Sequence, residues 1–126
     1  MPKKSNRRGL RYMLDKIIVE KMLRYVTKVC GYCKDVSYDD FQANDMLIEA
    51  CVFNLSQIGE LCSKMGDEIK KENPQVAWAQ IYGLRNRIVH DYEGVNLRLI
   101  WEIISDDMPE LQQELSIIKK RLDENG

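Results

Sequence analysis

The side chains best suited to phosphate chemistry lie in one short segment, from Gly83 to Tyr92. It holds His90, the single histidine of the chain, together with Arg85, Asn86 and Arg87. A histidine, with a pKa of about 6.5, can both accept and donate a proton near neutrality, and an arginine offers a fixed fork of donors to phosphate oxygens. In RNA cleavage the histidine would remove the proton of a ribose 2′-hydroxyl, and the arginine would stabilise the charge that builds on the phosphate. The segment therefore predicts acid–base cleavage of a phosphodiester.

A single undistorted helix does not bring these side chains together. At about 100° per residue, Asn86 lies within about 40° of His90, whereas Arg85 lies about 140° away, on the apolar side with Tyr92. To bring Arg85 and His90 together, the chain needs either a helix end near His90, for which Gly94 is a suitable residue, or a second copy of itself across a two-fold axis. A symmetric dimer would also supply two histidines, one to accept a proton and one to donate it. On composition alone, an exposed histidine beside two solvated arginines is the simpler interpretation.

Amphipathic helices should position this segment. From Leu10 onward, apolar residues recur at i, i+3, i+4 and i+7, which is typical of a helix with one buried face. The sequence predicts a first helix from Leu10 to about Val29, ending before Gly31, and a second from about Phe41 to about Lys71, with a cap among Ser37, Asp39 and Asp40. A third helix should run from Val76 to about Tyr92, followed by a short helix capped by Asn96. The last helix should be capped by Asp106 or Asp107, with Pro109 in its first turn. We expect an all-α fold, an antiparallel up-down bundle of four main helices plus a short additional helix.

Length and composition fit one domain. The 126 residues are 44% hydrophobic and 31% charged, enough to bury a core without metal or disulfide support. We therefore expect residues 1–126 to form a single helical domain, with residues 1–8 as a basic, flexible tail. No stretch approaches the roughly 20 apolar residues of a membrane span, and no hydrophobic region follows the basic start. A cytoplasmic location without a membrane partner is the expectation.

Four cysteines allow a different interpretation. Cys30 and Cys33 have Cys-x-x-Cys spacing, whereas Cys51 and Cys62 lie eleven residues apart, which returns both to one face of a helix as small apolar side chains. A zinc site of four thiols would have to join two separated segments, because the chain has one histidine and one Cys-x-x-Cys pair. Core or chemically neutral cysteines are favoured, and we expect no metal and no other cofactor. A cysteine-based metal or redox module stays open as an alternative.

The stretch from Arg85 to Tyr92 resembles the Arg-x4-His-x-Tyr motif of HepT proteins, within the larger HEPN superfamily. Nearly the whole chain after the basic tail is similar, with further matching features in family order: Ser37 to Phe41, Ile58 to Glu60, Trp78, Gly83 to Asn86, and Trp101 to Leu111. Ala77 is one departure, since the family often has proline before the tryptophan. This difference concerns the start of the helix that is predicted from Val76 to about Tyr92, and the Arg-x4-His-x-Tyr motif is unchanged.

The resemblance implies a bundle that dimerises, so that arginine and histidine of both subunits line a cleft, and that acts as a metal-independent endoribonuclease toxin. Arg85 and His90 would be the catalytic pair. Asn86 would orient the histidine or the phosphate through a hydrogen bond, and Arg87 would bind the RNA substrate.

HepT toxins are typically encoded beside MntA, a small nucleotidyltransferase antitoxin that attaches AMP units to the motif tyrosine, which is Tyr92 here. Added phosphates beside Arg85 and His90 would occupy the arginine and repel an RNA backbone. The partners implied are RNA, a MntA-like antitoxin and a second copy of the chain, as a homodimer or in a higher assembly with the antitoxin. Two alternatives stay open: Tyr92 as a packing residue, and the chain as a non-catalytic subunit that docks a nucleotidyltransferase or presents a nucleotide to it.

Overall fold

Helices make up the regular structure of the chain. A computed structural model describes the backbone of residues 2–93 and 96–125 and the side chains of residues 8–88 and 96–125. Within these ranges every regular element is helical: α1 (Pro2–Tyr32), α2 (Tyr38–Gln42), α3 (Asp45–Ser63), α4 (Asp67–Glu72), α5 (Trp78–Tyr82), α6 (Leu84–Glu93), α7 (Leu97–Glu102), a π-helical turn η1 (Ile103–Asp107) and α8 (Met108–Asn125). The predicted all-α class is confirmed.

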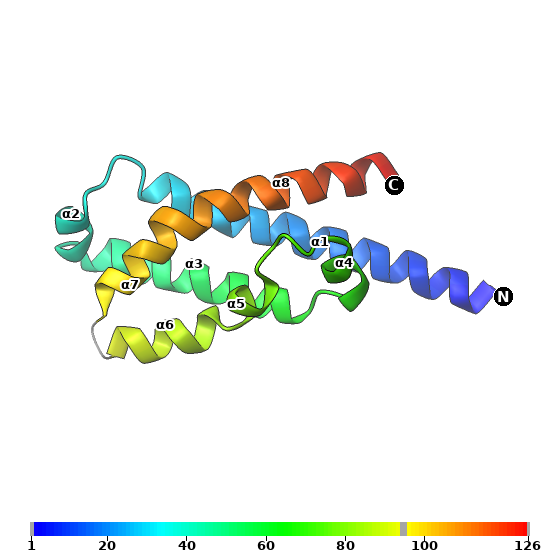
Figure 1. Cartoon of the computed structure of the whole chain (residues 1–126), viewed down its shortest axis with the longest axis horizontal. Coiled ribbons are helices and arrows are strands. Elements are labelled where there is room, and N and C mark those ends of the chain that lie inside the picture. Colours follow the sequence, from blue (N-terminus) through cyan, green and yellow to red (C-terminus); the bar gives the residue numbers. More distant parts are fainter. Residues whose placement is uncertain (1, 94–95, 126) are drawn as a thin grey trace.

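The helices form an up-down bundle (Figure 1). The chain runs along the bundle in α1, returns in α3, runs forward again through α5 and α6, and returns through α7 and α8. Helix α1 packs against both α3 and α8, and α3 packs in turn against α5 and α6. The short helices α2 and α4 lie at opposite ends of the bundle. This arrangement matches the predicted four main helices and places α6 on the outer side of α3.

The core lies where the apolar faces of these helices meet. Its members recur every three or four residues, as expected for helices that bury one face. Each fully buried aliphatic side chain contributes about 1.5–3 kcal/mol to the free energy of unfolding. Residues with at most 3% of their surface exposed include Val19, Met22, Val26 and Val29 in α1, Cys51, Leu55, Ile58 and Cys62 in α3, and Leu111, Leu115 and Ile118 in α8.

The predicted helix from about Phe41 to about Lys71 is wrong as a single element, because the chain breaks it twice. Asn44 accepts a hydrogen bond from the Leu47 backbone N–H through its side chain, at 3.0 Å, and so begins α3. Gly66 begins α4, and its N–H donates to the buried carboxylate of Asp15, at 3.0 Å. Local caps therefore interrupt an apolar stripe that continues through both breaks.

Two of the predicted caps are confirmed. The hydroxyl of Ser37 accepts a hydrogen bond from the Asp40 N–H at 3.1 Å and begins α2. The side chain of Asn96 accepts one from the Leu99 N–H at 3.2 Å and begins α7. In both cases a short polar side chain satisfies a donor that the first helical turn leaves free.

The predicted cap at Asp106 or Asp107 is wrong, because both residues lie inside the π-helical turn that joins α7 to α8. The Met108 N–H reaches back to the Ile103 carbonyl, five residues earlier. Pro109 is the residue after Met108. Its ring and missing N–H would break a regular helical ladder here, and a π turn is one way to absorb such a residue.

Helix α1 begins at Pro2, earlier than the predicted start at Leu10. Two expectations stay predictions: that the basic residues 1–8 are flexible, and that the chain forms a single domain. In the described part of the chain, none of the helices combines the length and the apolar character needed to span a lipid bilayer.

Candidate active site

The predicted helix from Val76 to Tyr92 is divided at Gly83, and this division places Arg85 near a helix start. Gly83 is the C-cap of α5, and its N–H donates to the Ala79 carbonyl at 3.1 Å. Glycine has a low helix propensity, which favours an end at this position. Helix α6 then begins at Leu84, so Arg85 lies in its first turn.

Helix α6 is fixed to α3 by its apolar face. Leu84 is 4% exposed and Ile88 is fully buried, as the helical pattern predicts. Opposite them, Gly59 of α3 allows a close approach: a Cβ atom at this position would lie 3.1 Å from the Ile81 carbonyl oxygen and 3.3 Å from the Arg85 backbone nitrogen. A larger residue at position 59 would therefore push α5 and α6 away from α3.

Arg85 forms an ion pair with Glu60, the residue that follows Gly59. Its Nη1 atom donates to the Glu60 Oε2 atom at 2.9 Å, and the two side chains are 63% and 41% exposed. The helical wheel placed Arg85 on the apolar side of α6, whereas its long side chain extends to the surface beside α3. Most of the Arg85 side chain stays exposed to solvent in this ion pair.

Glu60 is a neighbour of Arg85 that residue chemistry alone did not identify. The pair joins positions 25 residues apart and exists because Gly59 brings the two helices together. Gly59 and Glu60 belong to a stretch that resembles the family, but no feature of the sequence links Glu60 to Arg85.

Asn86 and Arg87 lie on the exposed side of α6. Arg87 lines a hollow of about 90 Å³ together with Asp107, Glu110 and Glu114. Burial raises the pKa of Asp107, and the positive charge of Arg87 partly offsets this effect. Arg85 and Arg87 therefore have carboxylate neighbours on different elements: Arg85 on α3, and Arg87 on η1 and α8.

The remaining predicted site residues, His90 and Tyr92, belong to the last turn of α6. Their side chains lie outside the described part of the chain. The contact between Asn86 and His90, and the distance from Arg85 to either residue, consequently stay predictions.

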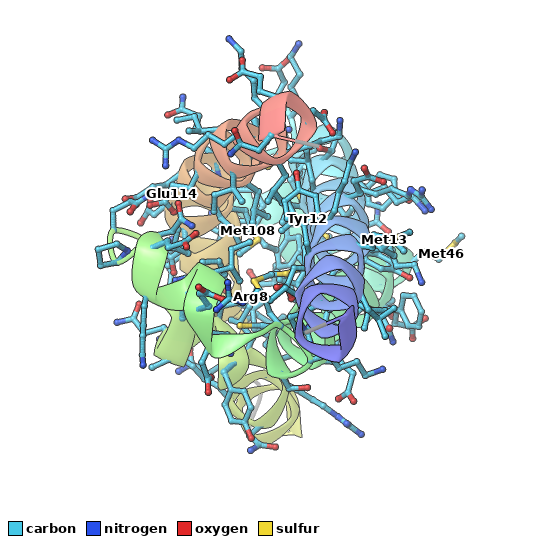
Figure 2. All side chains as sticks on the ribbon, turned by 90° about the vertical axis from the view of Figure 1, so that its right-hand side faces the viewer. Arg8, Tyr12, Met13, Met46, Met108 and Glu114 are labelled. Atoms are coloured by element: carbon cyan, nitrogen blue, oxygen red, sulfur yellow. The ribbon has the colours of Figure 1, made fainter. Side chains whose placement is uncertain are left out.

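A separate hollow of about 550 Å³ lies at the other end of the bundle, between α1, α4 and α8. Arg8 and Tyr12 line it, as the view from that end shows (Figure 2). The Tyr12 hydroxyl donates to the Leu122 carbonyl, and Glu68 and Glu72 add negative charge. Arg85, Asn86 and Arg87, the predicted site residues whose side chains the structure describes, do not line this hollow.

Comparison with known proteins identifies the family of the chain. The family model described as "Ribonuclease HepT-like" matches residues 22–118. "Putative RNase TTE0752" of Caldanaerobacter subterraneus subsp. tengcongensis is 32% identical over 103 residues, covering 79% of this chain and 92% of the relative. "Putative RNase MJ1380" of Methanocaldococcus jannaschii is 30% identical, covering 82% and 94%. "Probable ribonuclease HepT" of Thermococcus cleftensis is 22% identical, covering 81% and 93%.

No solved structure matches the chain. The family model covers more than half of the residues, including all of α3, α5, α6 and α7. The chain belongs to the HepT-like ribonuclease family.

Proposed function

We propose that this chain is a metal-independent endoribonuclease toxin whose Arg85 and His90 cleave RNA in the cleft of a homodimer. The exposed guanidinium of Arg85, held at the start of α6 and five residues before the only histidine, is the observation that carries the proposal. The two residues lie about 7.5 Å apart along the helix axis but on different sides of it. A second α6, antiparallel across a two-fold axis, would bring Arg85 of one copy toward His90 of the other.

The chemistry follows from the groups available. His90 removes the proton of a ribose 2′-hydroxyl, and the freed oxygen attacks the adjacent phosphorus. The bond from phosphorus to the 5′-oxygen breaks, and that oxygen takes a proton from the imidazolium of the second copy. Arg85 neutralises the charge that builds on the phosphate oxygens, and Asn86 orients His90 or the phosphate. Arg87 contacts the RNA backbone outside the reacting phosphate, in competition with its carboxylate neighbours.

RNA cleavage by the purified chain in EDTA tests this proposal. Intact mass must first show that the protein carries no added group, because a modified tyrosine would mask activity. We expect cleavage, and light scattering should show a dimer. An unmodified, folded protein that leaves RNA intact would instead support a non-catalytic subunit that docks a nucleotidyltransferase or presents a nucleotide to it.

Replacement of Glu60 by glutamine tests whether the RNA backbone passes over the Arg85 ion pair. Removing one negative charge at about 4 Å in water is worth about 1 kcal/mol, so RNA should bind roughly two- to fivefold more tightly. The free energy of unfolding should change by less than about 1 kcal/mol, because the pair is exposed. Binding is measured in a His90→Ala background to prevent cleavage.

The matched control is Glu49→Gln, which removes the same charge from an exposed position of the same helix, α3. Equal RNA affinities for the two variants would place the RNA path away from Glu60.

Tyr92 is the proposed site of regulation, since it shares α6 with both catalytic residues. A MntA-like nucleotidyltransferase would attach AMP units to it, and the added phosphates would occupy Arg85 and repel RNA. Co-expression with such a partner should add whole AMP masses to the chain and abolish cleavage. Tyr92→Phe should stay unmodified and active. Modification of that variant, or undiminished cleavage by the modified wild type, would contradict this regulation.

A further inference from the structure

Two cysteines that lie far apart in the sequence meet at one end of the bundle. Cys33 directly follows the end of α1, and Cys51 lies in α3. Their Sγ atoms are 3.5 Å apart. The Cys-x-x-Cys spacing pointed to Cys30 as the neighbour of Cys33, but the thiol in hydrogen-bonding contact with Cys33 is that of Cys51. A disulfide needs an S–S distance of about 2.05 Å, so the two sulfur atoms have about 1.5 Å to close.

The two thiols differ in their access to solvent. Cys51 is completely buried, whereas Cys33 is partly exposed. Cys33 also lines an open hollow of about 280 Å³, bordered by Cys30, Lys34 and Trp101. Cys33 is therefore the member of the pair that faces this hollow, and Cys51 does not line it. Lys34 adds a positive charge at the entrance.

The hydrogen bond between the two thiols also makes their pKa values differ. The hydrogen bond with Cys51 lowers the pKa of the Cys33 thiol. The same hydrogen bond, together with burial, raises the pKa of Cys51. Since the thiolate is the nucleophile, the accessible member of the pair is also the more reactive one.

We propose that Cys33 and Cys51 are a thiol pair that a hydroperoxide converts reversibly into a disulfide between the end of α1 and α3. The Cys33 thiolate attacks the peroxide, the O–O bond breaks, and Cys33 becomes a sulfenic acid while the peroxide is reduced to an alcohol, or to water in the case of hydrogen peroxide. The Cys51 sulfur then attacks the Cys33 sulfur. The S–O bond breaks, and hydroxide leaves with the thiol proton as water. A dithiol reductant restores both thiols.

This proposal is independent of the ribonuclease site, and its test needs no RNA. The reduced full-length chain is treated with hydrogen peroxide, quenched, and analysed by intact mass and by peptide mapping without reductant. We expect a loss of two hydrogen atoms, a cross-linked pair of peptides containing Cys33 and Cys51, and recovery of both thiols with dithiothreitol. The cross-link should raise the midpoint of thermal unfolding by about 5–10 °C.

Single variants identify the participants. Cys33→Ser and Cys51→Ser should each prevent the disulfide, and Cys51→Ser should accumulate a sulfenic acid at Cys33 that dimedone traps. Cys30→Ser and Cys62→Ala are the controls that should still form it. Circular dichroism of each variant confirms folding. A cross-link between Cys30 and Cys33, or four unchanged thiols after treatment, would overturn the proposal.

Discussion

Replacement of His90 by alanine is expected to reduce RNA cleavage by about 10²–10⁴-fold, the usual contribution of a positioned general acid or base. No other imidazole in the chain can substitute, because the sequence holds one histidine. Arg85→Ala should lower cleavage by about 10²–10³-fold, as loss of a donor to a charged transition state does. The readout is the single-turnover rate on a labelled RNA, with protein in excess.

Two further variants distinguish catalysis from general attraction to RNA. Arg85→Lys keeps the positive charge but loses the planar fork of donors, so its rate should lie between those of the wild type and Arg85→Ala. Arg24→Ala removes an exposed arginine from α1, away from α6, and should leave the rate unchanged. If Arg24→Ala lost as much activity as Arg85→Ala, the role of Arg85 would be non-specific.

Replacement of Ile88 by alanine should destabilise the fold by about 2–5 kcal/mol. Ile88 is fully buried on the face that fixes α6 to α3, so its truncation leaves a cavity between the two helices. Urea unfolding followed by circular dichroism gives the free energy of unfolding for wild type and variant.

The control for Ile88 is another isoleucine in a helix, Ile117 of α8, which is 50% exposed. Ile117→Ala should cost no more than about 1 kcal/mol, since most of its surface already contacts water. Equal losses from the two variants would show that α6 is not held in place by its apolar face.

Helical periodicity was sufficient to predict the bundle, because a buried face imposes the same spacing in every helix. It did not reveal the breaks at Asn44, Gly66 and Gly83, since the apolar stripe continues on both sides of each break. The last helix does begin at Met108 with Pro109 in its first turn, as predicted, but no capping side chain precedes it. Periodicity did not reveal the π turn that joins this helix directly to α7, because a π turn inserts a residue without interrupting the helical stretch.

The same difference applies to the candidate site: some of its residues can be recognised from the local sequence, and others only from tertiary contacts. Arg85 was identifiable because its chemistry and its spacing from His90 are local properties of the chain. Glu60 was not, because its pairing with Arg85 depends on how closely α3 and α6 approach at Gly59. The contact of Cys33 with Cys51 likewise depends on tertiary packing, whereas the sequence displays only the nearer spacing to Cys30.

The chemical identity of the RNA ends tests the central claim most directly. If His90 activates the 2′-hydroxyl and Arg85 stabilises the attacked phosphate, fragments produced in EDTA must carry 2′,3′-cyclic phosphates at one end and 5′-hydroxyls at the other. Mass spectrometry of a short cleaved RNA reads both ends in one experiment. Fragments with 3′-hydroxyls and 5′-phosphates would require water as the nucleophile and would contradict the proposed role of His90.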